Sequence, residues 1–99
     1  MLRYAGCLVV PDQKDWDRQV EKGEIRIYGD RFNVWGGFST KFPTEFPCFY
    51  KYVDSWDSHS CGDWIPISKE EGVNKMIARA KLEIEDLTNL CQVLEKYRS

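Results

Sequence analysis

Three side chains in the middle of the chain could bind a metal ion or act as nucleophile and base. Cys48, His59 and Cys61 offer two thiolates and one imidazole, which are donors that zinc prefers. A structural zinc site has four ligands, and the usual modules supply them as C-x-x-C pairs, which this sequence lacks. A cysteine nucleophile would need His59 beside it and a lowered thiol pKa, and no flanking signature indicates either. A small metal protein or enzyme built on these residues therefore ranks third among the interpretations below.

Other groups with chemical potential are also incomplete. Asp54, Asp57 and Asp63 lie in one polar segment, but they do not form the ladder of alternating oxygen ligands of a calcium loop. Gly36-Gly37 is not followed by the Lys-Ser/Thr pair and the helix of a phosphate-binding loop. Because no catalytic set is visible, the sequence predicts a non-enzymatic protein that needs no cofactor and no metal.

Composition and charge narrow the class of partner. The chain has 99 residues, 42% of them apolar, and a formal charge of −2, which fits one domain with one modest core and gives no basic patch for direct nucleic-acid binding. No apolar run reaches the roughly 18 residues of a membrane span, and residues 2–10 lack the features of a signal peptide. We therefore expect a cytoplasmic protein whose four cysteines stay as thiols. Its four Trp, five Tyr and five Phe exceed what a small core buries, and aromatic residues are enriched at protein interfaces.

The longest regular element expected is an amphipathic helix over residues 68–99. Its apolar residues recur at alternating spacings of four and three, as they do along one face of a helix. This row, termed the seam, consists of Val73, Ile77, Ala80, Ile84, Leu87, Cys91 and Leu94. Ser68 and Glu71 match a capping box, so the helix should begin near Lys69.

Such a helix should extend beyond the domain to which it belongs. At about 1.5 Å per residue, about 29 residues span roughly 43 Å, whereas a compact chain of this length has a radius of gyration of about 13 Å. We expect the N-terminal half of the seam to cover the protein's own sheet over about three or four turns. Leu87, Leu90, Leu94 and Tyr97 then need a surface on a partner protein or on a second copy of the chain.

The first two thirds of the chain should form strands and one short helix. The expected elements are a strand at residues 2–10, a helix at 12–22, a hairpin with strands at 24–28 and 31–35, an extended loop or edge strand at 38–47, and a strand at 48–53. Gly23 can cap the short helix, and Gly29-Asp30 can form the hairpin turn. The expected fold class is α+β, with a small antiparallel sheet, a short helix and one long C-terminal amphipathic helix. These elements form a single domain, 1–99, with a sheet-rich part at 1–67 and the long helix at 68–99.

The apolar pattern also predicts which side chains are buried. Four hairpin residues alternate at the strand period of two and should share one buried face. They are Ile25, Ile27, Phe32 and Val34. Cys7 lies among apolar neighbours and Cys91 lies on the seam, so both are expected to be small core residues.

An apolar run precedes the long helix. Trp64, Ile65, Pro66 and Ile67 follow a polar loop that holds Trp56. An X-Pro bond favours trans by only about 0.5–1 kcal/mol, so a bound prolyl isomerase could shift it and re-aim the helix. The alternative is that Pro66 ends a strand and stays trans. The candidate partner-binding residues of this region are Trp56, Trp64, Ile65 and Pro66, and Pro11, Pro43 and Pro47 are competing isomerase sites.

Two segments and the small size of the chain relate it to a known group of proteins. The segments are Arg26-Ile27-Tyr28-Gly29-Asp30-Arg31-Phe32 and Trp64-Ile65-Pro66-Ile67-Ser68. In these the chain resembles the small host-takeover proteins of temperate bacteriophages, and within them the anti-RecBCD inhibitors of lambdoid Salmonella phages. The resemblance implies a host-cytoplasmic protein that binds the RecC subunit, alters the processing of double-stranded DNA ends and recruits a host peptidyl-prolyl isomerase.

Together these observations predict a non-enzymatic inhibitor or modulator of a host protein complex. The partner-binding residues would be the four candidates before the long helix together with Leu87, Leu90, Leu94 and Tyr97. A homodimeric structural or regulatory protein, joined through the helix seam, is the alternative. An inhibitor should be a monomer until it meets its target, whereas a seam dimer should be a dimer alone.

Overall fold

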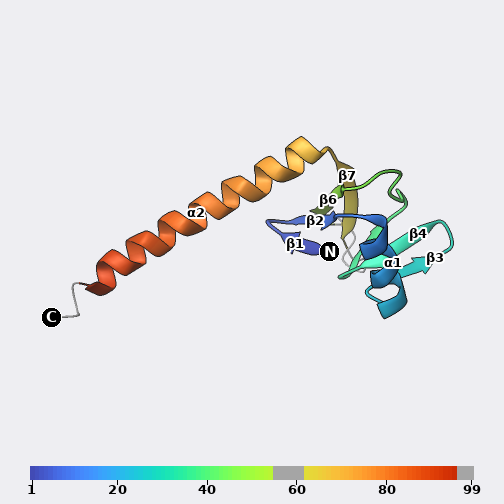
Figure 1. Cartoon of the computed structure of the whole chain (residues 1–99), viewed down its shortest axis with the longest axis horizontal. Helices are drawn as coiled ribbons and strands as arrows, with labels where there is room; N and C mark the ends of the chain where they lie inside the picture. The colour runs from blue at the N-terminus through green and yellow to red at the C-terminus, as the bar shows by residue number, and fades with distance from the viewer. Residues whose placement is uncertain (55–61, 96–99) are drawn as a thin grey trace.

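The computed structural model describes residues 1–54 and 62–95. Its two parts are a curled sheet with one short helix, termed the head (residues 1–54 and 62–67), and a long helix that projects from the head (Figure 1). The described molecule measures 61 × 34 × 26 Å and has a radius of gyration of 17.3 Å, against about 13 Å for a compact chain of this length. The expected overhang of the helix is therefore confirmed.

The seven strands of the described residues form one mixed sheet. The elements in chain order are β1 (Leu2–Tyr4), β2 (Cys7–Val10), α1 (Gln13–Lys22), β3 (Ile25–Tyr28), β4 (Arg31–Val34), β5 (Gly37–Ser39), β6 (Cys48–Val53), β7 (Asp63–Ile67) and α2 (Lys69–Glu95). The sheet order is β1-β2-β6-β7-β5-β4-β3. All neighbours are antiparallel except β5 and β7, which are parallel. The chain is α+β, but the prediction of a small antiparallel sheet is wrong.

Two unexpected pairings enlarge the sheet. Residues 2–10 form a hairpin and not one strand, because Ala5 (φ 54°) and Gly6 (φ 73°) adopt the left-handed backbone of a tight turn. Strand β5 joins β7 with Phe38 opposite Asp63, and the Phe38 backbone N–H donates to the Gly62 carbonyl at 3.0 Å. This contact joins β5-β4-β3 to the remaining strands, so that seven strands make one sheet.

The short helix and the central hairpin lie where they were predicted. Asp12 caps α1 by accepting a hydrogen bond from the Asp15 backbone N–H at 2.7 Å, and Gly23 ends the helix with φ 81°. The hairpin pairs β3 with β4 in the register Ile25–Val34 and Ile27–Phe32. Local caps and turn residues therefore account for these two elements.

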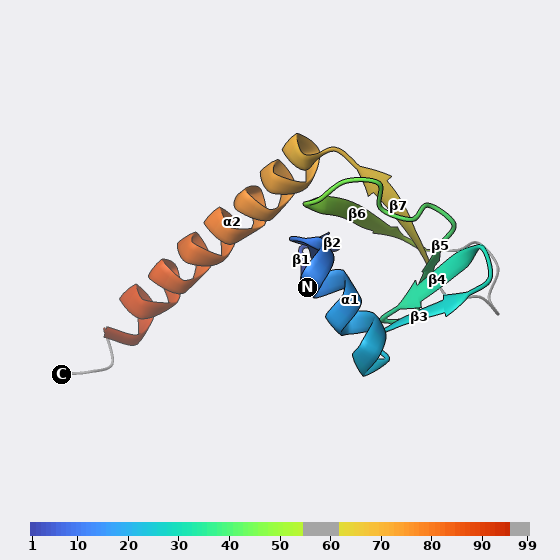
Figure 2. The same ribbon diagram turned by 45° about the vertical axis from the view of Figure 1, so that its right-hand side comes forward.

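The core lies between α1 and the sheet, which curves around that helix (Figure 2). Its buried members are Leu8, Val10, Trp16, Ile25, Phe32, Val34, Tyr50 and Trp64. Trp16 of α1 meets Phe32 of β4 edge to face, with ring centroids 5.1 Å apart. Trp64, which was expected at an interface, is thus part of the centre of the head.

Two residues that were expected in the core are exposed. Ile27 is 48% exposed, since the core cluster reaches Ile25 at the start of the edge strand β3, which is 1% exposed, but not Ile27 farther along it. Cys91 is also exposed, because α2 has left the head at that point (Figure 1). Cys7, in contrast, is fully buried as predicted.

Candidate protein-binding surface

The first turns of α2 are anchored to the sheet. The Glu71 backbone N–H donates to the Ser68 hydroxyl at 3.1 Å, so the helix begins at Lys69 as predicted. Gly72 is buried, and a Cβ at this position would lie 2.5 Å from Cδ1 of Phe49 on β6. The absent side chain therefore allows the helix backbone to approach the sheet closely.

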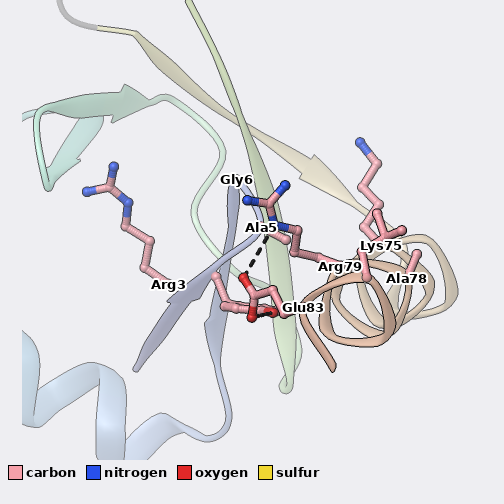
Figure 3. A pocket seen from close by; sticks show the side chains of 9 residues that line it. Arg3, Ala5, Gly6, Lys75, Ala78, Arg79 and Glu83 are labelled. Carbon is pink, nitrogen blue, oxygen red and sulfur yellow. Dashed lines mark hydrogen bonds and ion pairs between the residues drawn. The ribbon is translucent and has the colours of Figure 1, made fainter. Parts of the chain in front are cut away.

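A second contact links α2 to the tip of the β1–β2 hairpin. The Tyr4 hydroxyl donates to Oε2 of Glu83 at 2.6 Å, and Nε of Arg79 lies 3.4 Å from Oε1 of the same carboxylate (Figure 3). The hydrogen bond to Glu83 raises the pKa of Tyr4, because the carboxylate stabilises the protonated phenol. This contact fixes the direction of the helix about four turns from its start.

The two halves of the helix seam have different environments. In the N-terminal half of the seam, Val73 and Ala80 are partly buried next to the head, whereas Ile77 is 48% exposed, so this half covers the protein's own sheet only in part. Every residue from 81 to 95, termed the projecting half, is exposed. Its large apolar side chains have exposed fractions of 56% (Leu82), 64% (Ile84), 61% (Leu87), 52% (Leu90), 48% (Val93) and 57% (Leu94).

Most of these apolar side chains gather on one side of the projecting half. With about 100° per residue, Ile84, Leu87 and Leu94 lie along one line of the helix, and Leu90 widens this line on one flank. Leu82 lies roughly opposite the seam. The projecting half therefore has a continuous apolar stripe, with Leu82 and Val93 on the opposite side of the helix, and none of these residues is covered by the described part of the head.

A cleft of about 820 Å³ separates the β1–β2 turn from the first half of α2, and Arg3, Lys75 and Arg79 line it. Figure 3 shows Arg3 and Lys75 extending in different directions. The guanidinium of Arg3 lies 5.8 Å from the ring centre of Trp35, and Arg79 is paired with Glu83. Because the three cations do not converge on one point, this cleft lacks the geometry of an anion site.

A smaller groove of about 510 Å³ lies beside β7, lined by Phe38, Trp64, Ile65 and Pro66 among others. Ile65 is 41% exposed, and Pro66 is exposed within β7, opposite Tyr50 on β6. Trp64 is only 2% exposed, and its indole N–H donates to the Val34 carbonyl at 2.8 Å. Trp64 is therefore a core residue, whereas Ile65 and Pro66 are accessible to a partner.

Most of the remaining candidate residues from the sequence lie outside the described part of the chain. Trp56, His59, Cys61 and Tyr97 lie outside the described residues. Cys48 is half-buried, and burial raises the pKa of its thiol, which disfavours the thiolate form. Within residues 1–54 and 62–95, no three His, Cys, Asp or Glu side chains gather as a metal site would require.

The predicted partner-binding residues thus fall on two separate surfaces. Ile65 and Pro66 lie on the sheet, and Leu87, Leu90 and Leu94 lie on the projecting half of α2. Neither helix in the described part of the chain is both long and apolar enough to cross a membrane. Comparison with protein-family models, with curated proteins and with solved structures found no match to this chain. Evidence on function therefore comes from these surfaces themselves.

Proposed function

We propose that this protein is a non-enzymatic protein-binding protein and that the projecting half of α2 is its binding element. The observation behind the proposal is the exposure of Ile84, Leu87, Leu90 and Leu94, each at least 52% accessible, on a helix that extends away from the core. Burial of one such side chain contributes about 1.5–3 kcal/mol. A protein surface that covers this stripe would therefore gain most of its affinity from a few residues.

The amino acids on the stripe favour a protein over other ligands. Aliphatic side chains in a row of about three helical turns form the kind of surface that another helix or a hydrophobic groove accepts. The same stretch has acidic residues at Glu83, Glu85 and Asp86, which oppose binding to nucleic acid or to an anionic membrane. On the resemblance noted in the sequence, the bound protein would be a host complex such as RecBCD, contacted through RecC.

A matched pair of substitutions tests this proposal. Leu87→Asp places a charge on the stripe, and Leu82→Asp places the same charge on the opposite side of the same helix, at similar exposure. Both variants should keep the melting temperature of the wild type. We expect Leu87→Asp to lose protein association, measured by sedimentation of the purified chain and by binding of immobilised protein to purified RecBCD, while Leu82→Asp retains it.

The proposal is wrong if both variants associate with protein as well as the wild type does. It is also wrong if Leu87→Asp unfolds the isolated head, since the stripe would then belong to the core. Two kinds of protein could occupy the stripe, a host protein and a second copy of this chain. The pattern of residues on the seam distinguishes between them.

A further inference from the structure

The spacing of the seam identifies the kind of element that fits it. Spacings that alternate strictly between four and three residues are those of positions a and d of a coiled-coil heptad. Position a is occupied by Ile77, Ile84 and Cys91, and position d by Val73, Ala80, Leu87 and Leu94. This repeat of about 3.5 residues would keep one face of the projecting half turned toward a neighbouring helix. The expected occupant of the stripe is therefore a helix.

We propose that this helix is the projecting half of a second copy of the chain, and that the two run antiparallel. The inference rests on the proposed function, because it names the protein that covers the same stripe. In the register we infer, Ile84 packs against Leu94 of the second copy and Leu87 against Cys91 of the second copy. The two-fold axis then crosses the helix pair at the level of residue 89, and every contact occurs twice, as a symmetric interface requires.

Leu90 distinguishes the antiparallel from the parallel arrangement. It occupies position g, beside the seam, and is 52% exposed. In the antiparallel register Leu90 lies next to Leu90 of the second copy, so two apolar side chains meet near the axis. In a parallel pair the g position faces the following e position, which is Glu95, and an apolar residue would meet a charged one.

The positions of charged residues beside the seam also favour the antiparallel arrangement. Lys81 and Glu95 both occupy position e, and the antiparallel register places each of them beside the other in the second copy. Within one chain they lie about 21 Å apart along the helix axis, too far to form an ion pair. In a parallel pair Lys81 would instead face Met76 of the second copy, at the preceding g position, so it would have no acidic partner there.

The position of the head is compatible with this pairing. The head contacts α2 through Gly72 and Glu83, which lie about 70–90° around the helix from the middle of the seam, on the flank of Leu90. An antiparallel overlap of residues 81–95 places the two heads at opposite ends, so each head stays clear of the other. An overlap of about 22 Å is short for a coiled coil, and we expect a dimer whose population depends on protein concentration.

A charge-swap experiment on the full-length chain tests the register. Sedimentation equilibrium would compare wild type, Lys81→Glu, Glu95→Lys and the double variant, with circular dichroism to verify folding. Each single variant should weaken dimerisation by about tenfold, because it turns two attractive pairs into two repulsive ones. The double variant should recover the wild-type dissociation constant, since both pairs are restored with their charges exchanged.

Three results would overturn the inference. If the double variant loses as much free energy of dimerisation as the two single variants together, the register is excluded. A disulfide between two Cys91 residues on mild oxidation, mapped by mass spectrometry and absent from Cys91→Ser, would indicate a parallel pair. A wild-type chain that stays monomeric at every concentration would exclude the dimer, and binding of that monomer to RecBCD, lost in Leu87→Asp, would leave the proposed function intact. If Leu87→Asp still associates with itself and with RecBCD as the wild type does, both proposals are overturned.

Discussion

Two leucines show how differently the two parts of this molecule use the same kind of residue. Leu8 in strand β2 is 1% exposed, and Leu87 in the projecting half of α2 is 61% exposed. The first packs in a core with aromatic residues from α1, β4 and β6, such as Trp16, Phe32 and Tyr50, whereas the second has left the head behind. Apolar character therefore does not by itself place a residue in a core, and its place depends on whether a second layer covers it.

The largest effect on stability is expected at the centre of the head. Phe32→Ala removes a fully buried ring that packs against Trp16 and Tyr50, and it should cost about 3–5 kcal/mol. Ile27→Ala, directly opposite on β3, is the matched control and should cost less than about 1 kcal/mol, because Ile27 is 48% exposed. Chemical denaturation followed by tryptophan fluorescence measures both. Equal losses would mean that the edge strand is as well covered as the centre of the sheet.

The second effect concerns the buried carboxylate of Asp15. It is paired with the ammonium group of Met1 and accepts a hydrogen bond from the side-chain amide of Gln19 at 3.1 Å. Asp15→Asn should destabilise the head by about 1.5–3 kcal/mol, as the loss of hydrogen bonds to a charged group does. Asp17→Asn, on the exposed side of the same helix, is the control and should change little.

The same carboxylate predicts how the stability of the head depends on pH. The hydrogen bond from the Met1 ammonium lowers the pKa of Asp15 below its ordinary value. In the unfolded chain this pKa is about 3.9, so the contribution of Asp15 to folding is complete well above that value and is lost as the pH falls through the lower folded-state pKa. The free energy of unfolding should therefore fall with acid below about pH 4 less steeply in Asp15→Asn than in wild type. Parallel pH curves for the two proteins would contradict this.

The elements that the sequence predicted are those with local signals. Helix α1 has Asp12 and Gly23 as caps, and α2 has Ser68 as its N-terminal cap. Gly29-Asp30 marks the turn of the β3–β4 hairpin. The same reasoning missed the turn at Ala5-Gly6, because Leu2 and the apolar residues after Gly6 read as one continuous strand. The Ala5-Gly6 pair was a weak sequence signal for this turn.

The sheet as a whole could not be predicted in this way. The parallel pairing of β5 with β7 rests on one register pair, Phe38 with Asp63, between segments about 25 positions apart along the chain. Local periodicity contains no information about such a pairing. On the candidate surface, the overhang followed from the length of α2, whereas the burial of Trp64 depended on its hydrogen bond to Val34 on β4, which sequence spacing does not show.

A third, smaller effect is expected where the two parts meet. Gly72→Ala would bring a Cβ to 2.5 Å from the ring of Phe49, and overpacking of this kind costs about 1–3 kcal/mol. The higher helix propensity of alanine offsets about 1 kcal/mol of this destabilisation. A net loss of about 1 kcal/mol in thermal unfolding is therefore expected. Asn74→Ala, exposed on the same turn of α2, gains propensity without the contact and should stabilise slightly. Similar gains in both variants would show that the helix moves away from β6 without cost.

The smallest effect is expected from removing the projecting half itself. Deletion of residues 84–99 keeps the contacts of Gly72 and Glu83 with the head, so the unfolding free energy of the head should change by less than about 0.5 kcal/mol in dilute protein. The four tryptophans all precede residue 68, and their fluorescence reports on the head alone. Deletion of residues 72–99 is the contrasting variant: it uncovers Phe49, which is 7% exposed in the intact protein, and should cost about 1.5–3 kcal/mol. If the shorter deletion destabilises the head as much as the longer one, the exposed leucines support the fold and the division between the two parts does not hold. If only the longer deletion does so, folding does not require Ile84, Leu87 and Leu94, and binding is the property in which their loss should be measured.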